Sequence, residues 1–364
     1  MTRVFFAFRD APDRRAALRT AGSLDRYRLF GLDEIAARGA RVRHNLERDS
    51  PPLWARVTGR AINAALGVGG GLGGDFAAIL ASLRAMNEAD VVFSTVDTVG
   101  IPLMQLRRAG VVHPPVVYAS IGLPERLERA RNDRLFRGAL RKARTIVTYA
   151  SFEADRLREW LGAEGPPVVF VPFGVDTEAF RPVADRRPEI DVVSIGADPR
   201  RDFELLLAVA ARRPQWSFRI VAPAERVRSL GDTAANVSAE SNLPLEIVRE
   251  RIAQARVVAL PVRENSYSGA TTTLLQGLAM AKPVIVSRTD AIAEGYELED
   301  GVNCRLVAPG DAEAFEDALS ELLANENAAQ ALGERARETV ARHFSWRRYT
   351  DALWEILSAA TGRS

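Results

Sequence analysis

The chain has 364 residues, of which 47% are apolar, and its 49 Lys and Arg nearly balance its 47 Asp and Glu for a net charge of +2. This length exceeds what one hydrophobic core usually serves, so two domains of about 150 to 200 residues are expected. The apolar runs are far shorter than the ~20 residues of a transmembrane helix, which excludes a bilayer-spanning segment. Cys304 is the only cysteine, which excludes an intramolecular disulfide and a thiolate metal cluster.

Short β-branched or aromatic runs alternate along the chain with longer amphipathic segments, a pattern typical of a parallel sheet covered by helices. Strands are predicted at 4–8, 91–94, 115–120, 145–149 and 168–172, with helices near 24–37, 75–86, 124–143 and 152–161. After a polar, proline-containing linker at 177–188, strands follow at 191–195, 217–221, 257–261 and 283–286, with helices near 203–211, 244–254, 272–279 and 312–323. The fold class is therefore α/β with two sheets.

The N-terminal half carries the positive charge. Residues 1–185 hold 27 basic and 21 acidic side chains, against 22 and 26 in the remainder, and the densest basic stretch runs from 124 to 144. Without interleaved aromatic residues this pattern does not indicate nucleic acid, and a solvated helix is the favoured interpretation. Peripheral contact with the inner membrane face is the alternative. Since the N-terminus lacks the apolar core of a signal peptide, we expect a cytoplasmic protein.

A hydroxyl-rich loop precedes a predicted helix in the second half. The buried strand ending at Pro261 is followed by a polar loop, and the helix begins near Thr272. Unpaired N–H groups and the positive end of the helix dipole at that point suit a diphosphate. Five hydroxyls can add hydrogen bonds, which is more than one helix cap requires: Ser266, Ser268, Thr271, Thr272 and Thr273.

Several motifs in this order resemble the retaining nucleotide-sugar glycosyltransferases of the GT-B fold, the glycosyltransferase family 4-like group with many bacterial members. They are VPFGVD (171–176), SIG (194–196) with the following Arg200 and Arg201, LVAPGD (306–311) and HFSW (343–346). The resemblance implies two Rossmann-like, doubly wound domains facing each other across a cleft. An acceptor domain would occupy 1–178 and a nucleotide-sugar domain 189–345, and a C-terminal helix at 346–364 would cross back to the first domain.

The resemblance also implies roles for individual residues. Arg200 and Arg201 stand where the family neutralises the leaving diphosphate, and Lys282 is expected on the same side. A further set is expected to contact the donor: Gly196, Tyr267, Ser268, Gly269, Ala270, Thr271, Thr272 and Gln276.

Two departures from the family pattern bear on mechanism. The family carries two glutamates eight positions apart, one beside the transferred sugar and one on the ribose, but here the positions are Ser268 and Gln276. Gln276 retains a hydrogen-bonding amide, whereas Ser268 cannot supply negative charge. Glu264 is the nearest substitute, with a solvated loop carboxylate as the alternative interpretation.

The resemblance implies a hexosyl transfer. We expect it to need neither a metal ion nor a cofactor, because no Asp-x-Asp loop or His/Asp cluster has ligand spacing. In the family the leaving phosphate itself assists the acceptor hydroxyl, and retention results. The acceptor is unidentified: a glycan, a lipid-linked sugar or a small metabolite. The principal rival is a catalytically impaired pseudo-glycosyltransferase that serves as a binding or partner subunit. A nucleotide-sugar epimerase or hydrolase is the third interpretation.

Overall fold

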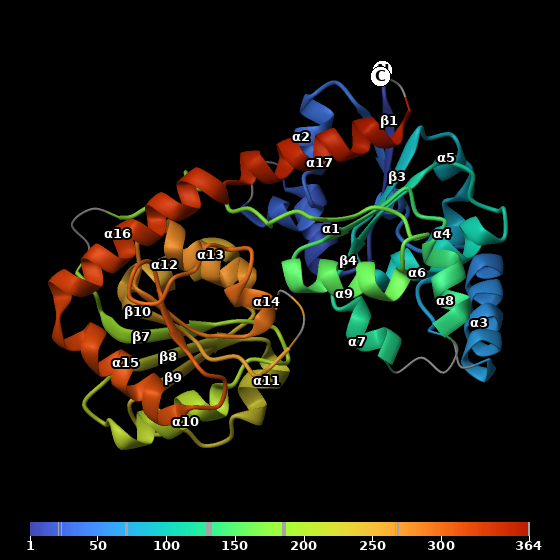
Figure 1. Cartoon of the computed structure of the whole chain (residues 1–364). Coiled ribbons are helices and arrows are strands. Elements are labelled where there is room, and N and C mark those ends of the chain that lie inside the picture. Colours follow the sequence, from blue (N-terminus) through green and yellow to red (C-terminus); the bar gives the residue numbers. More distant parts are fainter. Residues whose placement is uncertain are drawn as a thin grey trace. The chain divides into compact units, whose positions relative to one another are not determined.

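A computed structural model describes residues 1–20, 22, 24–69, 72–128, 133–183, 187–265, 267 and 269–362, shown in Figure 1. The chain forms two compact units: unit 1 is Met1–Val171 with Thr350–Ser364, and unit 2 is Pro172–Tyr349. Among the described helices, none has the length and apolar content needed to cross a bilayer.

Unit 1 is built on a six-stranded, all-parallel sheet of order β2-β1-β3-β4-β5-β6. The strands are β1 (Arg3–Ala7), β2 (Arg41–His44), β3 (Val91–Ser94), β4 (Val116–Ser120), β5 (Thr145–Thr148) and β6 (Val168–Phe170). The α-helices are α1 (Pro12–Arg19), α2 (Leu32–Ala37), α3 (Leu53–Val68), α4 (Phe76–Ala81), α5 (Leu83–Asn87), α6 (Asp97–Arg108), α7 (Leu123–Glu128), α8 (Asp133–Leu140) and α9 (Ser151–Leu161), and the 3-10 helices are η1 (Leu24–Leu29) and η2 (Asn45–Glu47).

Unit 2 is built on a second parallel sheet, of order β9-β8-β7-β10-β11-β12. The strands are β7 (Ile190–Ile195), β8 (Phe218–Ala222), β9 (Val237–Ser241), β10 (Ala255–Leu260), β11 (Val284–Ser287) and β12 (Arg305–Val307). The helices are α10 (Phe203–Arg212), α11 (Ala224–Ser229), α12 (Leu245–Gln254), α13 (Thr271–Ala279), α14 (Asp290–Ala293), α15 (Ala312–Ala324), α16 (Glu326–His343) and α17 (Trp346–Ala360), the last of which continues into unit 1. The predicted α/β class with two sheets is confirmed.

Helix α6 is absent from the helices predicted from the sequence, and it contains both Gly100 and Pro102. Pro102 has no N–H to donate within the helix, but the Thr98 carbonyl instead accepts the Asp75 amide at 2.8 Å. Gly100 lies directly against the Tyr118 ring, where a Cβ would overlap it. The two helix-breaking residues are thus accommodated by packing.

Other predicted helices are interrupted. The helix expected over 24–37 consists of η1 and α2, separated by Phe30 and Gly31 with φ values of 53° and 85°. The helix expected over 75–86 breaks at Ser82 into α4 and α5. The basic stretch at 124–144 contains α7 and α8 on either side of 129–132, which lie outside the described residues.

Two of the sequence motifs pack together within unit 2. Val175 forms a parallel bridge with Ser345, and its amide donates to the Phe344 carbonyl at 2.9 Å. A Cβ on Gly174 would lie 2.7 Å from the Ser345 carbonyl oxygen, so only glycine fits. The Phe173 ring meets the Trp346 ring edge-on, with centroids 5.5 Å apart. The VPFGVD and HFSW runs therefore form one structural element.

Candidate functional site

The site lies in unit 2, where the strand order reverses between β7 and β10. In open parallel sheets such a reversal leaves a crevice outside the carboxyl ends of the strands. The loops after these strands are joined by the Asp202 amide donating to the Pro261 carbonyl at 2.9 Å and the Arg263 amide donating to the Arg200 carbonyl at 2.8 Å. An antiparallel bridge between Arg201 and Val262 adds to this link. The two loops thus form one connected edge.

Arg201 is the most informative side chain of this edge. It is 1% exposed, and its Nε and Nη1 atoms have no hydrogen-bond partner among the described residues. Burial lowers the pKa of the guanidinium to about 10, against an opposing effect of the Asp198 charge, so the group remains charged at neutral pH. A buried, unpaired charge is costly. The arrangement is one that a bound anion would complete.

Gly196 makes room for this guanidinium. It follows β7, its amide donates to the Val221 carbonyl at 3.0 Å, and a Cβ at this position would overlap Arg201 Nε. The Arg201 backbone is held in turn by Arg226, whose Nη2 donates to the Arg201 carbonyl at 3.0 Å. The buried position of Arg201 is therefore specified by its surroundings.

Asp198 is a site residue that the sequence reasoning missed. Its Oδ1 accepts the Arg200 amide at 2.7 Å and the Tyr267 hydroxyl at 3.1 Å, so it connects both loops. A Cβ on Gly269 would overlap the Asp198 carboxylate. Its position three residues after the end of β7 is the signal that would have placed it here. The half-buried Arg200 belongs to the same loop.

The N-terminus of α13 completes the edge. The first-turn amides of this nine-residue helix have no intrahelical acceptors. Ala270, at the N-cap position, provides no side-chain acceptor for them either. Thr272 is half-buried, whereas Thr271 and Thr273 are 2% and 8% exposed. Gln276, one turn further, is 4% exposed. Ser266 and Ser268 lie outside the described residues. The uncapped amides provide donors suited to an anion.

Glu264 and Lys282, two further residues predicted at the site, lie in different places. Glu264 is exposed on the same loop and its Oε1 accepts the Asn265 amide at 3.2 Å. Lys282 does not face the site, so that prediction is wrong: its Nζ donates to the carbonyls of Ala253 and Ala255 at 2.8 and 2.7 Å. Ala255 begins β10, so Lys282 lies at the amino edge of the sheet, opposite Arg201.

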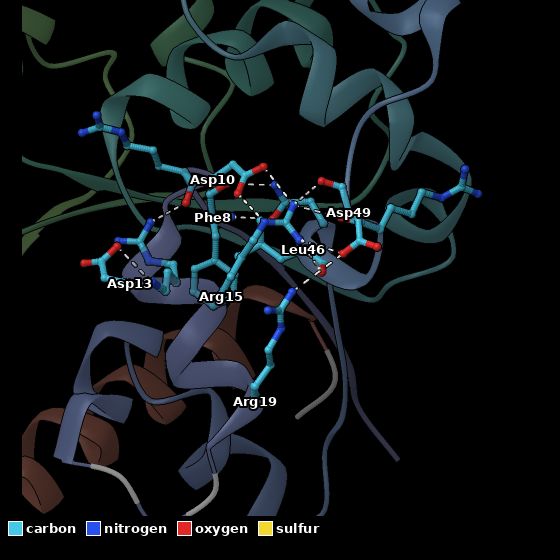
Figure 2. Close-up of polar contacts among 11 residues, drawn as sticks. Phe8, Asp10, Asp13, Arg15, Arg19, Leu46 and Asp49 are labelled. Carbon is cyan, nitrogen blue, oxygen red and sulfur yellow. Dashed lines mark hydrogen bonds and ion pairs between the residues drawn. The ribbon is translucent and has the colours of Figure 1, made fainter.

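Unit 1 has a contrasting arrangement after its own first strands. Figure 2 shows Arg15 bonded to Asp10 through Nε and Nη2, at 2.6 and 2.9 Å. The same Nη2 donates to the carbonyls of Arg48 and Asp49 at 2.9 and 3.1 Å. This guanidinium ties the loop after β1 to the chain after β2, and its donors are directed to groups of the protein itself.

A buried acidic cluster also lies at the carboxyl ends of strands in unit 1. Glu153 Oε1 accepts bonds from the Ser120 hydroxyl and from the Gly122 amide at 3.0 Å, whereas Oε2 has no partner among the described residues. Burial and the nearby Asp97 raise the pKa of Glu153 to about 8. Burial raises the pKa of Asp97 to about 7, although its bond from the Tyr118 hydroxyl opposes this. These two acids hold protons near neutral pH.

Among the residues with described positions, no group of three or more His, Cys, Asp or Glu side chains is placed to hold a metal ion. The polar groups gathered at the β7–β10 edge are mostly hydrogen-bond donors, which suit an anion better than a cation.

A doubly wound unit with donors gathered at the reversal of its strand order defines a Rossmann-like class of protein. Within that class, residues 178–325 match the model of the family described as Glycosyl transferases group 1. The family resemblance predicted from the sequence is thereby confirmed.

Curated relatives carry names consistent with this family. The chain is 27% identical over 294 residues to a D-inositol 3-phosphate glycosyltransferase of Saccharomonospora viridis, covering 72% of this chain and 66% of the relative. It is 25% identical over 250 residues to a GDP-mannose-dependent alpha-(1-6)-phosphatidylinositol monomannoside mannosyltransferase of Mycolicibacterium smegmatis, covering 61% and 65%. The matches thus span less than two thirds of these relatives' own lengths.

Solved structures share the fold over the whole chain. A sucrose-phosphate synthase from Thermosynechococcus elongatus matches with a TM-score of 0.77 at 18% identity, covering 100% of both chains. HepE of Anabaena in complex with UDP matches with a TM-score of 0.67 at 14% identity, covering 99% of this chain and 100% of HepE. The predicted GT-B fold class is confirmed.

Proposed function

We propose that this chain is a glycosyltransferase that moves a hexose from a nucleoside-diphosphate sugar to an acceptor hydroxyl. One observation carries the proposal: a fully buried guanidinium, with two unpartnered nitrogens, lies beside an uncapped helix N-terminus at the reversal of the unit 2 sheet. A diphosphate supplies the two negative charges and the multiple acceptor oxygens that this arrangement lacks.

The chemistry of sugar transfer follows from those hydrogen-bond donors. As the bond from the anomeric carbon to the diphosphate breaks, negative charge builds on the leaving oxygen, and Arg201 with the first-turn amides of α13 stabilises it. The acceptor oxygen bonds to the anomeric carbon, and its proton passes to the departing phosphate on the same face. No protein nucleophile is required, and retention of configuration results. Guanidinium and helix dipole take the role of a metal ion, so the transfer proceeds without metal or cofactor.

Other residues of the edge then bind the remainder of the donor. The buried Gln276 amide bonds the ribose hydroxyls, while Tyr267, Gly269 and Ala270 line the phosphates and sugar together with Thr271, Thr272 and the sequence position Ser268. Arg200 adds positive charge beside Arg201. Glu264 is the carboxylate of this loop that stabilises positive charge on the sugar in the transition state.

The acceptor class is taken from the relatives. Their names include an inositol phosphate and a phosphatidylinositol mannoside as acceptors, so a glycan, a lipid-linked sugar or a small polyol phosphate are the candidates for this chain. We place the protein in the cytoplasm, with the inner membrane face as its site of work where the acceptor is lipid-linked.

Calorimetric titration of the intact chain with UDP, GDP and ADP, each beside its monophosphate, tests the donor site. At least one diphosphate binds, and it binds at least about tenfold more tightly than its monophosphate, because the second phosphate makes its own charge-assisted bonds. Absence of binding by every diphosphate below millimolar concentration would refute the proposal.

The alternative, a binding subunit without turnover, is motivated by Ser268 standing in place of a family glutamate. It predicts diphosphate binding without any release of nucleotide from the sugar donor. Chromatography of UDP-glucose and GDP-mannose after long incubation separates the two. A transferase releases free nucleotide slowly to water and faster with its acceptor, whereas a binding subunit leaves the donor intact.

A further inference from the structure

Helix α3 of unit 1 has two apolar faces, and only one of them packs against the protein. Ala55 and Gly59 are buried, and Ile62 and Leu66 pack against the unit 1 core. A Cβ on Gly59 would lie 2.9 Å from the Ala77 amide nitrogen of α4, which shows how closely the helices approach. These positions, spaced three or four apart, account for the one stripe that a surface helix needs.

The opposite side of α3 carries a second apolar stripe that is exposed. Leu53, Trp54, Val57 and Val68 are 67%, 56%, 56% and 93% exposed. Ala61, Ala64 and Ala65 continue the stripe between them and are also exposed. At about 100° per residue, this stripe centres on the side of the helix opposite Ala55 and Gly59. This exposed stripe takes no part in the packing of unit 1.

Exposed large apolar side chains are concentrated on α3. Of the seven large apolar side chains that are exposed among the described residues, four belong to this helix. Figure 1 shows α3 at the outer margin of unit 1. Scattered single apolar residues need no explanation, but a continuous exposed stripe marks a contact surface.

The charges around the stripe identify its partner. Arg56 and Arg60 are exposed and lie one turn apart along one border of the stripe, and Leu53–Val68 contains no acidic residue. A second copy of the chain, docked antiparallel about a two-fold axis that runs across the helix, would bring these arginines against one another, which opposes that mode of self-association. An anionic lipid surface instead offers phosphates to the arginines and an apolar boundary to the stripe.

We propose that α3 docks unit 1 on an anionic lipid membrane. The helix lies parallel to the surface, with Trp54, Val57 and Val68 in the boundary between headgroups and acyl chains. Arg56 and Arg60 extend sideways to lipid phosphates. Trp54, in the first turn, is the residue type most suited to this interface, because its ring is apolar and its N–H reaches water. This surface differs from the basic stretch at 124–144 considered from the sequence.

Vesicle cosedimentation of the full chain tests the proposal, with vesicles of phosphatidylcholine alone and of equal parts phosphatidylcholine and phosphatidylglycerol. The unmodified chain partitions preferentially to the anionic vesicles. Trp54→Ser with Val57→Ser lowers partitioning by at least about tenfold, because two large apolar groups no longer enter the bilayer. Arg56→Gln with Arg60→Gln lowers binding to anionic vesicles by about fivefold per arginine and removes the lipid preference.

Val183→Ser with Val302→Ser is the matched control, since it removes two exposed apolar side chains of unit 2, and its partitioning equals that of the unmodified chain. All these positions are exposed, so far-ultraviolet circular dichroism and melting temperature stay unchanged. Failure of the unmodified chain to bind anionic vesicles overturns the proposal, as does full binding by the Trp54/Val57 variant. A dimer in light scattering that this variant abolishes overturns it too, because the stripe would then be a self-association interface.

Discussion

Arg15 in unit 1 and Arg201 in unit 2 both lie beyond the carboxyl ends of strands of a parallel sheet, yet their environments are opposite. Arg15 donates to a carboxylate and to backbone carbonyls of two loops. Arg201 is buried, with two nitrogens that lack a partner among the described residues. The first guanidinium is satisfied by the fold itself, and the second is not.

The difference separates a structural charge from a ligand-binding one. A guanidinium whose donors are hydrogen-bonded within the protein stabilises the folded chain, because those bonds are absent from the unfolded chain. A buried guanidinium with unpaired donors destabilises the folded chain until an anion binds to it. The acidic cluster of unit 1 is an intermediate case, because Glu153 has one saturated oxygen and one unpartnered oxygen. Four substitutions and one control variant test this distinction.

Arg201→Met should have the largest effect. We expect turnover, or diphosphate affinity where turnover is not yet measurable, to fall by about 100-fold or more, because the substitution removes the charge that faces the leaving group. The free energy of unfolding of the unliganded chain should stay equal or rise, since an unpaired buried charge is lost. Kinetics, titration and urea unfolding measure the three quantities.

Arg263→Met is the matched control for that variant, because Arg263 lies on the same edge but is exposed and paired with Glu204 at 2.9 Å. Its diphosphate affinity should remain within about threefold of the unmodified chain, since exposed ion pairs contribute little. Equal losses in both variants would mean that Arg201 has no special role.

Glu153→Gln should change how stability depends on pH. The folded pKa of about 8 lies above the ordinary value of 4.5, so the folded chain retains a proton that the unfolded chain has lost. The free energy of unfolding therefore falls as pH rises from about 4.5 to 8. Glutamine does not titrate, so the variant should lose about 3 to 4 kcal/mol of this decline, measured by urea unfolding at pH 5 and pH 8. An unchanged pH profile would show that Glu153 is already ionised.

Arg15→Met is the counterpart of the first substitution. It should lower the free energy of unfolding by about 1 to 2 kcal/mol, because several charge-assisted bonds between the two loops are lost. Diphosphate affinity should not change. A loss of nucleotide binding without loss of stability would reverse the assignment of the two arginines.

Tyr267→Phe should have the smallest effect. The substitution removes the 3.1 Å bond to Asp198 and leaves the ring in place. We expect diphosphate affinity to fall by about threefold, because the lost bond is a partly exposed bond to Asp198 and not a bond to the ligand, and titration would detect it. A change above tenfold would indicate direct contact between this hydroxyl and the ligand.

The sequence predicts the strands with continuous apolar runs, such as β7 and β10, because burial on both faces selects those residues. It does not predict β2 or β9, whose sequences RVRH and VSAES contain little apolar character and whose residues are mostly partly or fully exposed. The edges of a sheet depend on pairing partners that are distant in the chain. Local patterning alone does not reveal them.

The candidate site divides in a similar way. The motif around Arg200 and Arg201 directed attention to this loop, but the burial that distinguishes Arg201 depends on the packing around Gly196 and is not a property of the local pattern. Strand direction, by contrast, would have sufficed to exclude Lys282, since a residue that precedes a parallel strand lies at the amino edge. The position of Asp198 after β7 points to the same loop, but its link to the second loop appears only in the long-range bond from Tyr267.

The division of the chain also has a consequence for biosynthesis. Unit 2 is one continuous segment, whereas unit 1 needs Thr350–Ser364 as well as Met1–Val171. Leu353 and Leu357, both buried in α17, leave the ribosome after all of unit 2. Since domains fold as units during synthesis, unit 2 completes its core first, and the half that is translated first is the half that matures last.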